Sequence, residues 1–183
     1  MDRKSKATVD ELYHVPENGK AEIVKGELVH MAPTGFLPNR VAGAIYTSLR
    51  AYERRLGKGY TFSDNAAFKI SLPHRESFSP DVAFYIGEPT GMKFLEGAPV
   101  FAVEVRSEGD YGPAAEREIA EKRADYFAAG TLVVWDVDLL GDAVIRVYRA
   151  GDPTKSTVYR RGEVAEAEPA VPGWTMPVDD MFA

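Results

Sequence analysis

The spacing of apolar residues predicts two long helices in the chain. Between residues 38 and 59, apolar side chains recur every three or four positions, which is typical of a helix with one buried face. Asn39 is positioned as its N-cap, and Gly57 is a stop signal. A second helix is predicted from composition over residues 112–130, with Pro113 tolerated in its first turn.

Short apolar runs bounded by turn residues predict strands around these helices. The first is a hairpin over residues 21–31, which turns at Lys25 and Gly26. Further strands are predicted at residues 60–72, 77–87, 99–106 and 131–139, with a second hairpin over 143–162. The C-terminal tail is expected to pack Trp174 and Met176 against the body of the protein.

The order of these elements predicts a mixed sheet. A strand, a helix and another strand in succession imply a parallel right-handed crossover, whereas short loops join antiparallel strands. The expected fold class is therefore α/β, bordering on α+β, with helices against the sheet. The 183 residues lack repeats and long linkers, so we expect one domain over 1–183 with a flexible N-terminus at 1–10.

Composition narrows the possible chemistry. The absence of cysteine excludes disulfides, thiolate metal sites and cysteine nucleophiles, and the three scattered histidines do not have the spacing of a zinc site. The net charge of −6 disfavours a protein that coats nucleic acid non-specifically. It leaves open an enzyme that approaches a phosphate with a metal ion. No signal peptide or membrane span is evident, so a cytoplasmic location is expected.

Two carboxylates interrupt the predicted strands. Glu104 stands in the middle of an otherwise apolar strand, and Asp81 follows Pro80 near the start of another. If these strands are neighbours, the two carboxylates converge and repel each other. A divalent cation such as Mg²⁺ or Mn²⁺ removes that repulsion, and two carboxylates with a backbone carbonyl are sufficient ligands.

Other charged residues join this pattern. Glu22 in the first hairpin is a further acid, and Lys122 lies one helical turn before Tyr126 on the predicted second helix. Arg106 shares a strand face with Glu104. Each residue alone also fits an ordinary role, such as an ion pair on an edge strand or a solvated charge.

The order of these residues resembles the PD-(D/E)XK nuclease superfamily. Its signature would be Pro80-Asp81 followed by Glu104-Val105-Arg106. From about Glu22 to Phe182 the chain most resembles the Uma-type restriction endonucleases. The resemblance implies a restriction-endonuclease-like fold, with metal bound by Asp81, Glu104 and the carbonyl of Val105.

The resemblance also implies a basic residue in the site. In this family the role is often taken by a lysine on the helix, here Lys122, while Arg106 occupies the lysine position of the signature. We expect the two to share the role, although arginine stays charged and is a poor proton acceptor.

The predicted function is a Mg²⁺- or Mn²⁺-dependent endonuclease that hydrolyses phosphodiester bonds of DNA. Its predicted catalytic residues are Asp81, Glu104, Lys122, Arg106 and Glu22. The expected partner is nucleic acid, and the expected assembly is a homodimer. The alternative is a catalytically inactive module of the same fold that binds or regulates. A glycosidase with two carboxylates is a third class, which no aromatic-rich sugar platform supports.

Overall fold

The computed structural model describes residues 6–16, 19–142 and 144–183. Residues 1–5 of the expected flexible N-terminus therefore lie outside the described residues. Thr8 caps the first helix, because its side chain accepts a hydrogen bond from the backbone of Glu11 and the Glu11 side chain binds back to Thr8.

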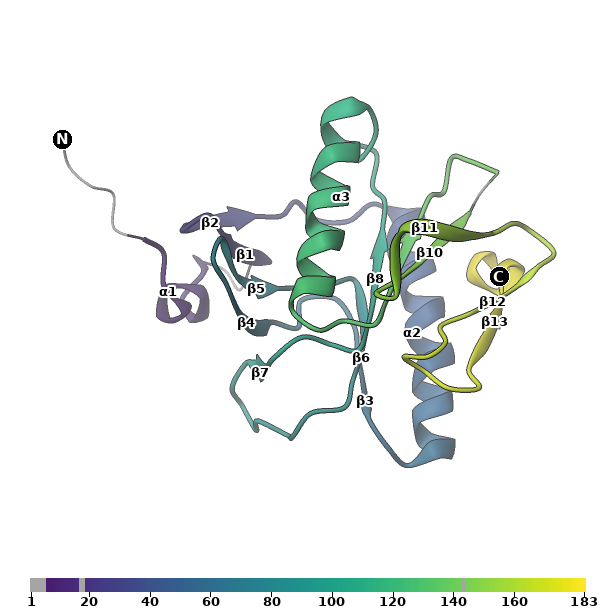
Figure 1. The fold of residues 1–183 in the computed structure, drawn as a ribbon, viewed down its shortest axis with the longest axis horizontal. Coiled ribbons are helices and arrows are strands. Elements are labelled where there is room, and N and C mark those ends of the chain that lie inside the picture. Colours follow the sequence, from purple (N-terminus) through teal and green to yellow (C-terminus); the bar gives the residue numbers. More distant parts are fainter. Residues whose placement is uncertain (1–5, 17–18, 143) are drawn as a thin grey trace.

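The chain forms three α-helices, one short 3-10 helix and thirteen strands in the described residues (Figure 1). The helices are α1 (Val9–Tyr13), α2 (Phe36–Leu56), α3 (Pro113–Ala128) and η2 (Val178–Phe182). The first strands are β1 (Ala21–Val24), β2 (Glu27–His30), β3 (Tyr60–Phe62), β4 (Phe68–Leu72), β5 (Arg75–Phe78), β6 (Val82–Tyr85) and β7 (Leu95–Glu96). The later strands are β8 (Phe101–Val105), β9 (Val133–Val137), β10 (Ile145–Arg149), β11 (Asp152–Tyr159), β12 (Val164–Glu166) and β13 (Thr175–Pro177).

The strands form a large sheet, a smaller sheet and a two-stranded ribbon. The large sheet has the order β11-β10-β9-β8-β6-β3, the smaller sheet β2-β1-β5-β4-β7, and β12 pairs with β13. Strands β8 and β9 are parallel and are joined through α3, as predicted, whereas β6 is antiparallel to β8. The α/β fold with mixed sheets and flanking helices is therefore confirmed.

Two predicted strands each divide between the two sheets. Residues 60–72 break near Asn65, which adopts a left-handed φ of 67°, and so form β3 and β4. Residues 77–87 break at Pro80, which lacks the N–H that a central strand needs, and so form β5 and β6. The chain therefore crosses from the smaller sheet to the large one immediately before Asp81.

Helix α2 begins earlier than the sequence predicts. Its N-cap is Gly35 and its first residue is Phe36, so the expectation that Asn39 caps it is wrong. Pro38 fits inside the first turn, where backbone N–H groups have no partner within the helix, and the helix therefore starts before it. Gly57 ends the helix in a left-handed conformation, with φ at 68°.

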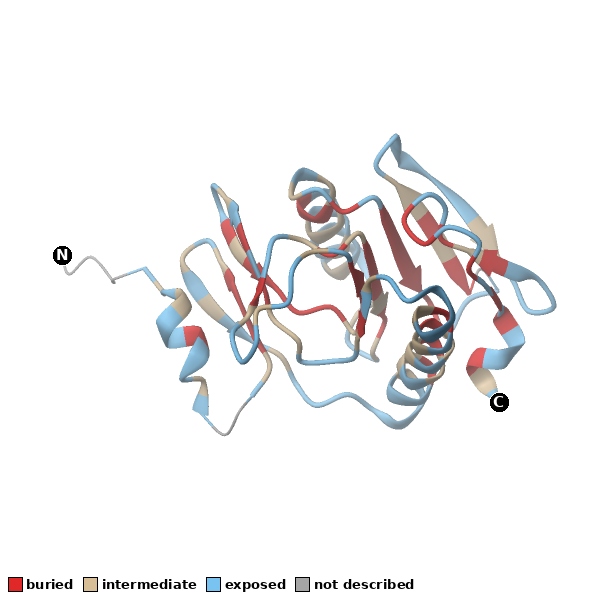
Figure 2. Ribbon diagram, turned by 90° about the horizontal axis from the view of Figure 1, so that it is seen from below, coloured by how far each residue is buried: buried red, intermediate tan, exposed pale blue. Residues whose placement is uncertain are grey.

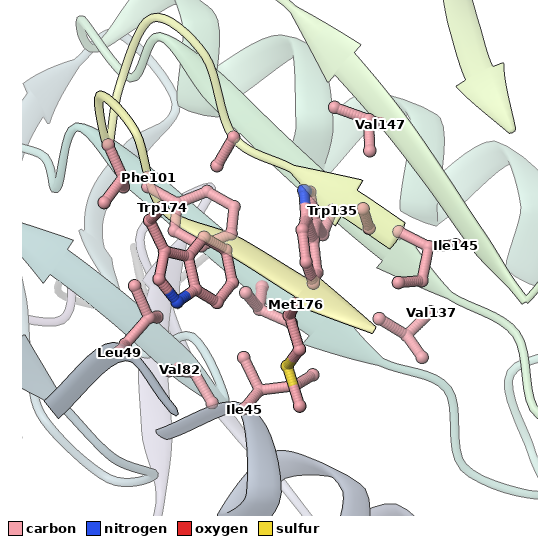
Figure 3. Packing of buried hydrophobic residues seen from close by; sticks show 14 of the residues in the cluster. Ile45, Leu49, Val82, Phe101, Trp135, Val137, Ile145, Val147, Trp174 and Met176 are labelled. Carbon is pink, nitrogen blue, oxygen red and sulfur yellow. The ribbon is translucent and has the colours of Figure 1, made fainter. Parts of the chain in front are cut away.

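One face of the large sheet packs against α2 and the C-terminal segment (Figure 3). Trp135 of β9 and Trp174 lie with ring centroids 5.1 Å apart, and Phe101 of β8 contacts Trp174 at 5.7 Å. Met176 belongs to the same cluster, so the predicted packing of the tail is confirmed. The central strands of this sheet are buried, whereas β11 at its edge is mostly exposed (Figure 2).

The other face of the large sheet lies under α3. Ala102 and Val134 of the large sheet share a buried cluster with Tyr126 of α3 and with Phe78 of the smaller sheet. The rings of Phe78 and Tyr126 stack at 4.0 Å. Helix α3 thus packs where the two sheets meet (Figure 1). Within the described part of the chain, none of the helices has the length and apolar character needed to cross a membrane.

The Trp174 contact predicts a stability test. Because Trp174 is almost fully buried between two aromatic rings, Trp174→Ala should lower the free energy of unfolding by about 3–5 kcal/mol. Chemical denaturation measures this loss. Met92→Ala is the control, because Met92 is fully exposed; equal unfolding free energies for the two variants would contradict the described packing.

Candidate active site

Asp81 is fixed at the point where the chain enters the large sheet. Its backbone N–H donates to the carbonyl of Val103 at 3.1 Å, which aligns it with β8. Its Oδ2 accepts a hydrogen bond from the N–H of Val105 at 2.8 Å. The carboxylate is therefore held beside the strand that carries Glu104.

Glu104 projects from the α3 side of β8. Its Oε1 accepts a hydrogen bond from the hydroxyl of Tyr126 at 2.6 Å and lies 2.9 Å from Nζ of Lys122. Burial raises the pKa of Glu104, and repulsion from Asp81 and Glu22 adds to this effect against the attraction of Lys122. The structure thus holds the two carboxylates on neighbouring segments, Asp81 by the N–H of Val105 and Glu104 by Tyr126 and Lys122.

Glu22 lies on β1 of the smaller sheet and is buried. Its Oε1 lies 3.0 Å from Nζ of Lys122 and accepts the N–H of Ser79, while Oε2 accepts from Arg75 at 2.7 Å. Burial alone favours the neutral acid, but Lys122 and Arg75 outweigh it and lower the pKa of Glu22. Glu22 is therefore an ionised carboxylate with both oxygens engaged.

Lys122 joins the two sheets from α3. Its ammonium group contacts Glu22 on the smaller sheet and Glu104 on the large sheet. Burial alone disfavours its charge, yet the two carboxylates raise the pKa of Lys122 above its ordinary value. Lys122 therefore remains protonated in this arrangement.

A second ion pair anchors α3 over the site. Arg75 of β5 donates from Nε to Asp125 of α3 at 2.8 Å, and the other oxygen of Asp125 lies 2.6 Å from Nε2 of His74. Asp125 is three residues from Lys122, so this contact fixes the turn of α3 that carries the lysine. The sequence reasoning missed Arg75 and Asp125, whose contact spans fifty residues of chain.

The sequence reasoning also missed Lys20. Its Nζ lies 3.0 Å from Oδ1 of Asp81 and 2.5 Å from Oδ1 of Asp64. Burial alone lowers the pKa of Lys20, but attraction from Asp81 and Glu104, with the Asp64 hydrogen bond, raises it above its ordinary value. The signal was present in the sequence, because Lys20 lies two residues before Glu22 and so shares a face with it at the start of the hairpin.

Arg106 does not join this cluster. Its Nε and one Nη donate to the two oxygens of Asp136, each at 2.7 Å, and its other Nη pairs with Glu116 at the start of α3. Arg106 pairs with Asp136 and not with Glu104, its neighbour on the strand face, because Asp136 offers a bidentate partner while Lys122 already pairs with Glu104. Arg106 ties β8, β9 and α3 together.

The donor set fits a hard divalent cation that keeps part of its water shell. Mg²⁺ prefers oxygen ligands and is commonly bound through one or two carboxylates. Asp81 and Glu104 supply such a pair from neighbouring chain segments. In the described ranges, no group of three or more histidine or acidic side chains forms a ready-made metal cage. The arrangement therefore suits Mg²⁺ or Mn²⁺ better than an ion that needs a full set of protein ligands.

Comparison with known proteins identifies the family. No curated protein matches the chain. The fold is similar to the crystal structure of "a putative nuclease belonging to DUF820" from Anabaena variabilis, with a TM-score of 0.74 and 16% sequence identity over 96% of this chain and 97% of that one. The Uma2 family model, described as "Putative restriction endonuclease", matches residues 8–179. The predicted resemblance is thus confirmed over most of the chain, and the protein belongs to the Uma2 family.

Proposed function

We propose that this protein is a metal-dependent endonuclease that hydrolyses phosphodiester bonds of DNA. The observation that carries the proposal is the hydrogen bond from the N–H of Val105 to Asp81, which holds this carboxylate beside the strand that carries Glu104, where Lys122 lies 2.9 Å from Glu104. Membership of a restriction endonuclease family supports a nuclease, and restriction endonucleases act on DNA. A homodimeric assembly stays a prediction.

Asp81, Glu104 and the carbonyl of Val105 would hold the Mg²⁺ or Mn²⁺ ion. When bound, such an ion polarises a phosphoryl oxygen and lowers the pKa of a coordinated water. The chain orients its own ligands for this purpose. The N–H of Val105 fixes one oxygen of Asp81, and the hydroxyl of Tyr126 fixes one oxygen of Glu104.

Lys122 supplies positive charge to the reacting phosphate. Because its two carboxylate partners raise the pKa of Lys122, it is a poor proton acceptor. A fixed ammonium group instead stabilises the negative charge that develops on the phosphoryl oxygens in the transition state. Tyr126 stays neutral, since burial raises the pKa of its phenol, and keeps donating to Glu104.

Glu22 and Arg106 act by positioning. Both oxygens of Glu22 are already bonded, to Lys122 and Ser79 on one side and to Arg75 on the other. Glu22 therefore holds the ammonium group of Lys122 and is not assigned as a metal ligand. Arg106 connects β9, through Asp136, to the start of α3, through Glu116, which leaves Lys122 as the basic residue beside Glu104.

Asp81→Asn tests the metal-dependent reaction. The substitution preserves shape but removes the charge that attracts a cation, so Mn²⁺ binding and DNA cleavage should both be lost while the fold is retained. Isothermal titration with Mn²⁺, nicking of supercoiled plasmid and circular dichroism measure the three properties.

The wild-type protein is the reference in each assay. A wild-type protein that retains DNA in low salt but cuts none with Mg²⁺ or Mn²⁺ would favour the inactive binding module. Undiminished cleavage by Asp81→Asn would remove Asp81 from the site.

Lys122→Met tests the role of the ammonium group. The variant keeps the length of the side chain and loses its charge, so cleavage should fall by about 10²–10³-fold, while Mn²⁺ binding is kept. Arg123→Met is the matched control, because Arg123 is the next residue of α3 and stacks on Tyr148 instead. Cleavage by Lys122→Met at the rate of Arg123→Met would show that Lys122 has no part in the reaction.

A further inference from the structure

Lys20 places a second ammonium group in the site, and the proposed reaction does not use it. Only 14% of its side chain is exposed, and its Nζ lies between Oδ1 of Asp81 and Oδ1 of Asp64. The two lysines of the cluster share one pattern. Each binds one proposed metal ligand and one acid outside that pair: Lys122 binds Glu104 and Glu22, and Lys20 binds Asp81 and Asp64.

The two proposed ligands differ in how far they are engaged. Glu104 contacts Tyr126 and Lys122 through Oε1 alone, and among the described residues no hydrogen bond reaches its Oε2. A cation can therefore bind Glu104 without displacing Lys122. Asp81 has both oxygens engaged, Oδ2 by the N–H of Val105 and Oδ1 by Lys20.

A divalent cation that binds Oδ1 of Asp81 therefore competes with the ammonium group of Lys20 for that oxygen. The N–H of Val105 belongs to the backbone of β8 and cannot move away without disturbing the strand. The Lys20 ammonium sits on a flexible stem and already contacts a second carboxylate, that of Asp64. The cation and the ammonium group of Lys20 carry like charges and repel each other at the Asp81 carboxylate. Because Lys20 has Asp64 as a second acceptor, it can leave Oδ1 of Asp81 free for the cation.

We propose that Lys20 occupies the cation position at Asp81 in the metal-free protein and withdraws to Asp64 when a divalent cation binds. The inference rests on the proposed function, since it takes Asp81 as a metal ligand. Lys20 is then a positioning residue that keeps the acidic pair neutralised without metal and lowers the affinity of the site for the ion. Asp64 acts through Lys20 by retaining the displaced ammonium group.

Mn²⁺ titration of the metal-free protein tests the competition without any reaction. By calorimetry in the absence of DNA, Lys20→Met should bind Mn²⁺ about tenfold more tightly than the wild type, because the competing charge is gone. Lys155→Met is the matched control, since it removes the same charge from the edge strand β11, where Lys155 pairs with Asp152. Its affinity should equal that of the wild type.

Asp64→Asn supplies a second variant that retains Lys20. It leaves the ammonium group with Asp81 as its remaining carboxylate partner, so Mn²⁺ should bind several-fold more weakly than to the wild type. The double variant Lys20→Met/Asp64→Asn should bind as tightly as Lys20→Met alone. An equal weakening by Asp64→Asn in both backgrounds would mean that Asp64 acts on the ion directly, which overturns the proposal.

The remaining outcomes separate this inference from the proposed function. Tight Mn²⁺ binding by the wild type with no gain in Lys20→Met would leave the metal site standing and refute the role of Lys20. Absence of Mn²⁺ binding by the wild type and by every variant would refute the metal site and the role of Lys20 together.

Discussion

The ammonium group of Lys122, which bridges Glu22 and Glu104, is the contact on which the site depends. Glu22 and Glu104 lie on different sheets, and the lysine between them is carried by the helix that packs against both. Loss of one partner from a buried ion pair costs about 3–5 kcal/mol, because an uncompensated charge is left behind. The proposed active site therefore exists only when the two sheets and α3 are assembled together.

Arg75 also connects the smaller sheet to α3. It binds Glu22 through one nitrogen and Asp125 through another, so the same buried acid orients Lys122 directly and the helix indirectly. Arg106 provides the matching connection at the helix start through Glu116. Helix α3, which carries Lys122, is thus fixed by ion pairs in its first turn and near its C-terminal end, and not by apolar packing alone.

Much of the site could be predicted because alternation along strands and spacing along helices are local. The period of two placed Glu104 on one face of its strand, and the crossover placed Lys122 and Tyr126 over that face. Arg75 was missed because its partners come from distant segments, and no local pattern specifies which strands of two sheets will meet. The sequence also did not predict that the strand expected over residues 77–87 divides at Pro80. A proline indicates a break in a strand, but it does not indicate that the chain changes sheets there.

Arg106 shows why a motif position does not fix a role. It occupies the basic position of the signature, yet its planar guanidinium group pairs bidentately with Asp136 on the adjacent parallel strand. Geometry and available counter-charge decide which cation faces the acidic pair. In this chain they select Lys122.

Anomalous diffraction from a crystal of the wild-type protein soaked in Mn²⁺ tests whether Asp81 and Glu104 hold one metal ion. We expect one strong peak within about 2.0–2.6 Å of carboxylate oxygens from both Asp81 and Glu104, with Lys122 still bonded to Glu22. A fully occupied Mn²⁺ site elsewhere, with no peak between Asp81 and Glu104, would contradict it.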